Sequence, residues 1–168
     1  MAKKSGSAQA RGAKGSGRQI VATNRKARHN YSIIEVFEAG VALVGTEVKS
    51  LRLGQASLAD AFATVDDGEV WLRNLHIPEY RHGTWTNHEP RRNRKLLLHR
   101  RQIDHLVGKT RDGNLALVPL SLYFSGGRVK VELALGRGKR EYDKRQDLAR
   151  RDAQRDVLRE LGQRAKNM

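Results

Sequence analysis

Hydrophobic positions in the first half of this chain form short runs, the pattern expected of strands rather than long helices. Apolar residues crowd together over 20–39 and again over 41–44, with many β-branched and aromatic side chains, and predict two strands separated by Gly40. Strands over 58–65 and 69–75 are expected on either side of an Asp-Asp-Gly turn. This half of the chain therefore predicts short strands joined by tight breaks.

The clearest strand signal lies further along, where 115–124 and 128–135 predict a hairpin that turns at 125–127. On its second arm, valine and leucine alternate with mostly charged residues. One face of this arm is thus expected to pack in the core and the other to face solvent. The stretch 76–94 contains prolines and a glycine with little periodicity and predicts a loop.

Helical spacing occurs in three places. A two-turn helix is expected from Thr46, as its N-cap, to Gly54, and a second over 100–109 that closes at Gly108. The third segment, 147–166, has a helix-forming composition but only a thin apolar stripe. We expect this segment to be loose alone and helical when it is held against a polyanion.

Short strands with a few small helices predict a mainly β fold, built as a small OB-type closed β-barrel over residues 20–137. Residues 1–19 have no large apolar side chain after Met1, so they are predicted to form a disordered basic N-terminal extension. Residues 138–168 are predicted to form a basic C-terminal tail that is disordered alone. Because OB-type barrels bind oligonucleotides on exposed strand faces and loops, the fold class points to nucleic acid.

Charge is divided unevenly along the chain. The formal net charge is +15, from 33 Lys and Arg against 18 Asp and Glu. Residues 1–30 hold eight basic and no acidic residues and 136–168 hold eleven against six, whereas 31–135 hold 14 against 12. Within that nearly neutral middle, six Lys and Arg gather over 91–101. Such patterned charge is suited to a polyanionic partner.

Two of the basic clusters, 24–31 and 136–145, also contain groups that can recognise bases. Tyr31 and Tyr142 could stack on unpaired bases, and the glycines of the second cluster allow backbone to approach phosphates closely. The alternative is a solvated charged face. Two such clusters flanking a neutral body favour RNA binding over that alternative.

The sequence gives little support for disulfides, metal sites, membrane-spanning segments or catalysis. The chain has no cysteine, which excludes disulfides and cysteine-based zinc sites and nucleophiles. No apolar run is long enough to cross a membrane, and no apolar stretch follows the basic start, so we expect a cytoplasmic protein. The six histidines match no zinc-ligand spacing and are expected to be solvent-exposed or to contact RNA. We predict no metal, no cofactor and no enzymatic activity.

Five motifs, in order along the chain, resemble the SsrA-binding protein family, also called small protein B. They are Ala22–Tyr31, Phe37–Gly40, Gly45–Arg52, Arg94–His99 and Gly138–Arg140 with 143–145. The resemblance implies an OB-type barrel that binds the tRNA-like domain of transfer-messenger RNA (tmRNA). It also implies delivery of that RNA to stalled ribosomes for trans-translation, in which the nascent peptide is tagged and the ribosome is rescued.

The resemblance further implies a division of roles within the chain. The tail would become helical on the ribosome, where it would occupy the empty mRNA channel and the decoding centre. The family is not enzymatic, and elongation factor Tu supplies the GTPase of the delivery complex. We expect this chain to act as a monomer.

The candidate site residues are the positions that the resemblance ties to RNA or to the ribosome, together with basic residues of the motifs and the tail. The candidate RNA-binding residues are Asn24, Arg25, Lys26, Arg28, His29, Glu38, Lys49, Arg52, Leu97, His99, Lys130, Gly138, Lys139 and Arg140. The candidate ribosome-contacting residues of the tail are Tyr142, Asp143, Lys144, Arg145, Arg150, Arg151 and Arg155. Glu38 is expected to orient a neighbouring cation or to accept from a base amine; the alternative is an ordinary solvent-facing strand residue.

Two other functions stay open at this point. A ribosomal or rRNA-maturation protein with an OB-type barrel and basic tails would show the same composition. A ribonuclease or RNA-modifying enzyme would lose its activity when one or two histidines are changed.

Overall fold

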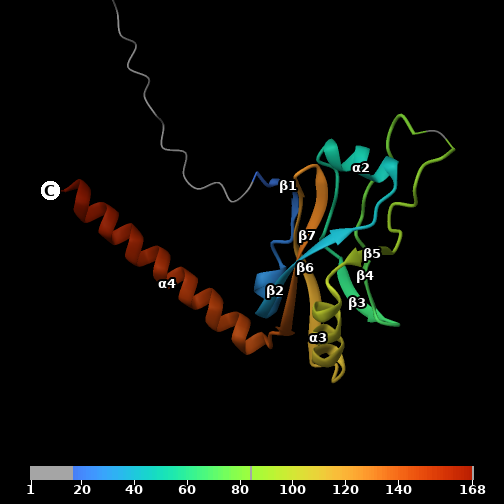
Figure 1. Cartoon of the computed structure of the whole chain (residues 1–168). Helices are drawn as coiled ribbons and strands as arrows, with labels where there is room; N and C mark the ends of the chain where they lie inside the picture. Colours follow the sequence, from blue (N-terminus) through green and yellow to red (C-terminus); the bar gives the residue numbers. More distant parts are fainter. Residues whose placement is uncertain (1–16, 84, 168) are drawn as a thin grey trace, which may run out of the picture.

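The computed structural model describes residues 17–83 and 85–167, and this part of the chain holds seven strands and four helices (Figure 1). The strands are β1 (Gln19–Thr23), β2 (Tyr31–Val41), β3 (Phe62–Asp66), β4 (Glu69–Arg73), β5 (Arg94–Leu97), β6 (Leu115–Ser125) and β7 (Arg128–Gly138). The helices are α1 (Ala27–Asn30), α2 (Gly45–Arg52), α3 (Arg100–Thr110) and α4 (Glu141–Lys166). The predicted mainly β fold with short helices is confirmed, and a long helix is added at its C-terminal end.

All strand pairings are antiparallel, and together they close the sheet into a ring. The order β6, β3, β4, β5, β2, β7 returns to β6, because the last two strands also form a hairpin with each other. β1 lies on the same edge of β6 as β3 and extends that edge beyond the ring. This ring is the closed arrangement of strands expected of a small barrel.

The main core fills the inside of the ring. On β7, Val129, Val131, Leu133 and Leu135 are all buried, while the charged residues between them are at least partly exposed. The predicted alternation on this strand is therefore confirmed. Burial of four large apolar side chains on one strand makes the β6–β7 hairpin the stable centre of the fold.

A second, smaller apolar cluster holds α1 against the sheet. It consists of Ala27 from α1, Val118 and Leu120 from β6, and Ala134 from β7, all of them buried. This apolar cluster positions α1, which carries part of the first basic cluster of the sequence. Its packing fixes those basic side chains on the outside of the β6–β7 hairpin.

The region predicted as one strand over 20–39 is divided in the structure, because α1 separates β1 from β2. The prediction that Gly40 ends a strand is wrong. Gly40 lies within β2 and pairs with Leu97 on one side and Lys130 on the other. A Cβ at Gly40 would lie 3.3 Å from the Cβ of Leu97, so the missing side chain lets β5 approach closely. The predicted separate strand over 41–44 is absent from the described residues.

The beginning of the described chain is also ordered differently from the prediction. Residues 1–16 of the predicted N-terminal extension lie outside the described residues. Gln19, however, begins β1 and pairs with Phe124. The residue before it, Arg18, makes side-chain contacts with the ring that are described below.

The ends of the short helices differ from their predicted positions. Thr46 lies inside α2 rather than capping it, and the Glu47 carboxylate accepts a hydrogen bond from the backbone N–H of Val44, 3.1 Å away. Helix α3 continues through Gly108 and ends at Thr110. Glycine lowers helix propensity by only about 1 kcal/mol, which is too little to end a helix that packs on the sheet.

The hairpin of β3 and β4 has the predicted turn. Asp67 and Gly68 adopt positive φ angles of 50° and 74°. Two successive positive φ angles are characteristic of a tight turn between twisted antiparallel strands. β3 begins at Phe62 rather than at the predicted Leu58, although Leu58 is buried in the main core.

Helix α4 leaves the end of β7 and projects away from the ring (Figure 1). None of its 26 residues is buried. The predicted helix-forming character of this segment agrees with the structure, whereas its disorder in isolation stays a prediction. No helix within the described ranges combines the length and apolar character needed to cross a bilayer.

Candidate nucleic-acid interface

The first basic cluster lies on α1 and the turn that precedes it. Arg25, Lys26 and Arg28 are exposed, and His29 is half-buried. Among the described residues, no carboxylate lies within 4.0 Å of the three basic side chains. Their positive charges are therefore available to a polyanion, as predicted for this part of the sequence.

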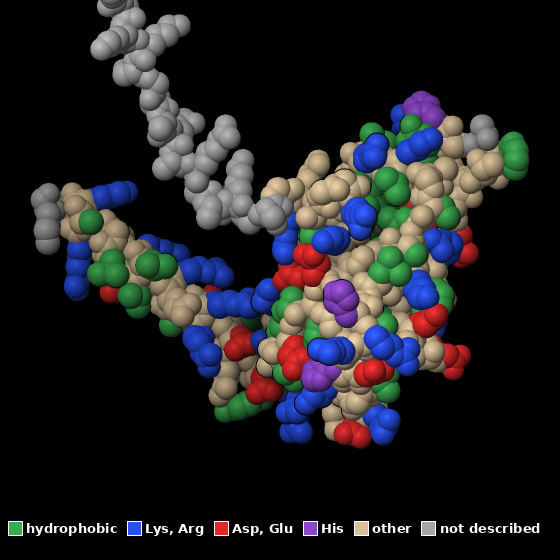
Figure 2. All heavy atoms as spheres, in the orientation of Figure 1, with side chains coloured by type: hydrophobic (Ala, Val, Ile, Leu, Met, Phe, Trp, Pro, Cys, Tyr) green, Lys and Arg blue, Asp and Glu red, His purple; other side chains and the backbone are tan. Residues whose placement is uncertain are grey.

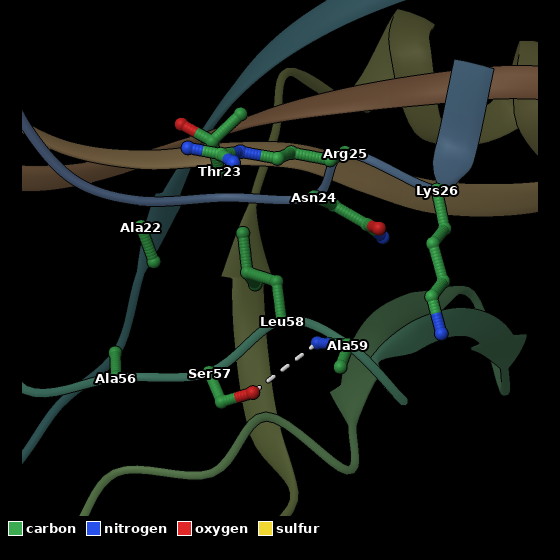
Figure 3. A pocket seen from close by; sticks show the side chains of 9 residues that line it. All are labelled: Ala22, Thr23, Asn24, Arg25, Lys26, Ala56, Ser57, Leu58 and Ala59. Atoms are coloured by element: carbon green, nitrogen blue, oxygen red, sulfur yellow. Dashed lines mark hydrogen bonds between the residues drawn. The ribbon is translucent and has the colours of Figure 1, made fainter. Parts of the chain in front are cut away.

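Asn24 precedes these cations and is held in a fixed position. The residue is only 8% exposed, and its Nδ2 donates a hydrogen bond to the carbonyl of Pro119, 3.1 Å away. Its backbone N–H donates to the carbonyl of Leu120 at 2.8 Å. The amide thus points into a hollow that it shares with Lys26 and residues 56–59 (Figure 3).

The second basic cluster begins where β7 ends, directly beside the first. Gly138 pairs with Tyr31 across the sheet, and the backbone N–H of Lys139 donates to the carbonyl of Asn30 at 2.8 Å. The Lys139 Nζ donates to the carbonyl of Arg28, 3.1 Å away. Two clusters more than a hundred residues apart in the sequence therefore form one surface.

Lys139 also connects this surface to α4, because its ammonium group is ion-paired with Asp147. The hydrogen bond from Lys139 lowers the pKa of the Asp147 carboxyl. Arg140 is exposed, and its backbone N–H approaches the carboxylate of Asp143 at 3.4 Å. Lys and Arg side chains follow α4 along its length in Figure 2.

The tail residues predicted to contact the ribosome lie along this projecting helix. Lys144 is partly buried near its start, and the remaining predicted residues are exposed (Tyr142, Asp143, Arg145, Arg150, Arg151 and Arg155). The Tyr142 hydroxyl accepts a hydrogen bond from Gln146 at 2.8 Å, one helical turn further on. The helix therefore presents its charged and aromatic groups without any covering segment from the ring.

Glu38 lies towards the C-terminal end of β2, at the centre of a network of hydrogen bonds and ion pairs. Its Oε1 accepts from Lys130 Nζ at 2.7 Å, and its Oε2 accepts from the Tyr123 hydroxyl at 2.6 Å and from Arg18 at 3.1 Å. The Arg18 guanidinium also lies 4.6 Å from the centre of the Tyr123 ring, a cation–π arrangement. Hydrogen bonds from Lys130 and Tyr123 hold the pKa of Glu38 below its usual range.

Both carboxylate oxygens of Glu38 are thus occupied by donors from the chain itself. This arrangement supports the interpretation that Glu38 orients neighbouring cations, because two of its three donors are the cationic groups of Arg18 and Lys130. The sequence does not indicate this position of Arg18, because the residue lies in the stretch predicted to be a disordered extension. Its signal was weak, since a single arginine among glycine and serine residues predicts no fixed position.

Leu97 and His99 come from β5 and the start of α3. Leu97 is 53% exposed and lies opposite Gly40, whose other neighbour is Lys130. The structure therefore brings Leu97 close to the Glu38 network. His99 is exposed and precedes α3, where its backbone N–H donates to the side chain of Gln102 at 3.2 Å.

Lys49 and Arg52 are exposed on α2, which lies at the end of the ring away from the start of α4 (Figure 1). The Lys49 Nζ lies 5.5 Å from the centre of the Tyr80 ring. Arg52 lines a shallow hollow with Gln19 and Phe124. The structure therefore does not bring these two residues together with the surface at α1.

The basic run over 91–101 is only partly available to a polyanion, which corrects the sequence prediction. Arg94 and Glu47 have fully buried side chains and form an ion pair with each other. Arg92 joins the same carboxylate at 2.6 Å. Burial acts to raise the pKa of Glu47, but hydrogen bonds from Arg92, the Val44 backbone and Arg94 outweigh it and hold that pKa below its usual range.

His88 also differs from its predicted place at the surface. Its ring is buried, and its Nε2 donates to the carbonyl of Ile77 at 2.8 Å. Its Nδ1 lies 2.9 Å from the Thr46 hydroxyl. Within the described ranges, no group of three or more His, Asp or Glu side chains is arranged to hold a metal ion.

The closed β ring and its exposed cations define a class of protein. Its interior charges are paired, whereas the basic side chains of α1 carry no paired acid among the described residues and lie against the end of β7. This is the architecture of an RNA-binding protein. The chain belongs to the SmpB family, since the model of the family described as "SmpB protein" matches residues 21–163.

Similar proteins agree with this assignment. An SsrA-binding protein from Mycolicibacterium paratuberculosis is 80% identical over 168 residues, covering 100% of this chain and 99% of the relative. One from Mycobacterium tuberculosis is 86% identical over 152 residues, covering 90% of this chain and 95% of the relative. A chain in the solved structure "tmRNA-SmpB: a journey to the center of the bacterial ribosome" is 48% identical with a TM-score of 0.61, covering 75% of this chain and 92% of that one.

Proposed function

We propose that this chain binds the tRNA-like domain of tmRNA and delivers that RNA to stalled ribosomes for trans-translation. The observation that carries the proposal is the similarity to the solved tmRNA–SmpB chain, at 48% identity. The names of the SsrA-binding proteins, at 80% and 86% identity, support it further. The surface formed by α1 and the end of β7 supplies the cations that a folded RNA requires.

The two parts of the chain have separate roles in this proposal. The ring binds RNA through the residues at α1, the Glu38 network and the end of β7. Helix α4 acts in the ribosome, where it occupies the empty mRNA channel and the decoding centre. Its lack of any buried residue supports this role, because a helix that contributes nothing to the core is free to bind elsewhere.

The remaining partners follow from the same proposal. Elongation factor Tu joins the delivery complex and supplies GTP hydrolysis, and this chain performs no catalysis of its own. The chain acts as a monomer in the cytoplasm and requires no cofactor. The rival function, a ribosomal or rRNA-maturation protein, predicts a different set of bound RNAs.

The bound RNA can be identified directly. The tagged full-length chain is purified from its own cells and the RNA that copurifies is sequenced. We expect strong enrichment of one small RNA, tmRNA, over ribosomal RNA. Stoichiometric recovery of ribosomal subunits with no preference for a small RNA would support the rival function instead.

A matched pair of variants makes this experiment specific. Lys26→Glu reverses an exposed charge on the surface at α1, and Lys109→Glu reverses an exposed charge on α3. The first change is expected to reduce the recovery of tmRNA because it repels a phosphate. The second is expected to leave recovery close to that of the unchanged chain.

A further inference from the structure

We propose that a groove between α1 and residues 56–62 receives one unpaired base of the bound RNA, with Phe62 as its stacking platform and Asn24 as its hydrogen-bond acceptor. The inference rests on the proposed RNA binding. It adds a base-binding subsite beside the exposed cations of this surface. Phe62 belongs to none of the motifs from which the candidate RNA-binding residues were taken.

The groove consists of two adjoining hollows. One has a volume of about 310 Å³ and the other about 260 Å³, and both are lined by Asn24, Lys26 and Ala59. Figure 3 shows the first hollow, with the Asn24 amide and Lys26 on one side and residues 56–59 on the other. The second continues along α1 to Phe62. Together they form a continuous groove beside the exposed cations.

Asn24 places a fixed acceptor in the wall of this groove. Its Nδ2 is committed to the carbonyl of Pro119, which sets the direction of the whole amide. Among the described residues, no donor lies within hydrogen-bond distance of its Oδ1. Every nucleobase carries an N–H donor on its Watson–Crick edge, so a base in the groove can satisfy this oxygen.

Phe62 supplies an aromatic surface at the other end of the groove. The residue is 41% exposed, whereas Phe37 and Phe124 pack against the main core. A phenylalanine on a strand normally turns its ring into the core, and this one lines the second hollow instead. Stacking of bases on exposed aromatic rings is the usual way in which proteins hold unpaired nucleotides.

The charge at the rim favours a nucleotide over an uncharged occupant. Arg25, Lys26 and Arg28 stand on the α1 side, and Asp60 is the acid that lines the groove. The net positive charge at the rim can neutralise the phosphate of the inserted nucleotide. An apolar side chain of a protein partner would leave the Asn24 oxygen without a donor, and a lone phosphate would make no use of Phe62.

Two substitutions at Phe62 separate stacking from simple apolar contact. Phe62→Tyr keeps the ring and Phe62→Leu removes it, and both are measured for binding of the full chain to a transcript of the tRNA-like domain. We expect Phe62→Tyr to bind within about twofold of the unchanged chain. Phe62→Leu should bind about 5- to 150-fold more weakly, the range for the loss of one base–aromatic stack.

The dependence on salt distinguishes this effect from a general loss of RNA contacts. Phe62→Leu should leave the slope of log K against log[salt] unchanged, because no phosphate contact is lost. Lys26→Gln should reduce the magnitude of that slope by about 0.7–0.9. Leu158→Ala, which shortens an exposed side chain on α4, is the control and should leave both quantities unchanged.

Equal affinity of Phe62→Leu and Phe62→Tyr would overturn the base-binding groove while leaving RNA binding intact. Failure of the unchanged chain to prefer the tRNA-like domain over an unrelated transcript of similar length would overturn the proposed function and the groove together. The fraction of active protein in each titration is determined from its stoichiometry. A partly unfolded variant lowers that fraction and does not imitate a weaker dissociation constant.

Discussion

Glu47 and Arg94 are charged side chains with no exposed surface, and each depends on the other for its solvation. Arg94 also donates to the carbonyl of Leu75 at 2.6 Å and to that of Pro90 at 3.2 Å. The pair thereby fastens α2 and the long loop before β5 to the ring. A buried charge that loses its oppositely charged partner is costly, because hydrogen bonds to neutral groups do not replace the lost ion pair.

Arg94→Met is expected to lower the free energy of unfolding by about 3–5 kcal/mol. The change removes one of the two cations that are paired with the buried Glu47 carboxylate. Urea unfolding measures this quantity. The neighbouring Lys95→Met removes an exposed ion pair with Glu69 and should cost about 0–1 kcal/mol. Equal effects of the two changes would contradict the structural role of Arg94.

The same pair makes stability sensitive to acid. The pKa of Glu47 is held below its ordinary value in the folded chain. A group of this kind stabilises the fold fully above its unfolded pKa, and the stabilisation is lost as the pH falls through the lowered folded pKa. Glu47 therefore contributes to unfolding in acid and not to any loss of stability near neutral pH.

The hydroxyl group of Tyr123 influences the pKa of Glu38. Its hydrogen bond lowers the pKa of Glu38, and burial together with this bond raises the pKa of Tyr123 itself. Tyr123→Phe is expected to raise the pKa of Glu38, because one of the bonds that favour the carboxylate is lost. A carbon-detected NMR titration of the Glu38 carboxyl measures the shift. An unchanged pKa would show that Lys130 and Arg18 alone determine it.

At the scale of elements, the β6–β7 hairpin and α4 differ most in how many of their residues are buried. The hairpin owes its order to side chains buried inside the ring. Helix α4 buries no residue, and its contacts with the ring are concentrated near its start, where Asp147 pairs with Lys139. An isolated helix of this kind is marginally stable in water, so α4 can change its surroundings without disturbing the fold.

Truncation after residue 145 tests the proposed division of roles between the ring and α4. We expect the shortened protein to bind the tRNA-like domain within about threefold of the full chain, because the ring and the start of the second basic cluster remain. Peptide tagging on stalled ribosomes should be abolished. Binding is measured with the isolated RNA and tagging in a translation reaction. A shortened chain that no longer binds RNA would contradict this division of roles.

At the scale of the whole molecule, the basic side chains differ in whether they are paired with acids or exposed. Part of it is neutralised inside the fold, as at Arg94, and part belongs to the Glu38 network, where Arg18 and Lys130 face Glu38 and Glu132. The exposed charge at α1 and along α4 remains for partners. The count of 33 Lys and Arg side chains therefore overstates the number of unpaired cations that the ring presents to RNA.

Binding of the tRNA-like domain should depend strongly on salt. If about six phosphates are contacted, log K is expected to fall with log[salt] with a slope of about −4 to −5, because each contact releases condensed counterions. Filter binding across a range of salt concentrations measures the slope. A flat profile would exclude the electrostatic account of the interface.

The sequence predicted the class of fold and the kind of partner because both depend on local features. The alternation on β7 and the Asp-Asp-Gly turn between β3 and β4 are properties of neighbouring residues. The basic clusters could likewise be counted without any knowledge of the fold. The motif resemblance identified the family from the same local information.

The tertiary structure decided which residues lie together and which charges stay free. Gly40 continues a strand because partners on both sides supply hydrogen bonds, and Arg94 is buried because Glu47 meets it from 47 positions away. The same applies to Asn24, whose direction is set by Pro119. A local pattern carries no information about such partners, since they are distant in the sequence and become neighbours only when the ring closes.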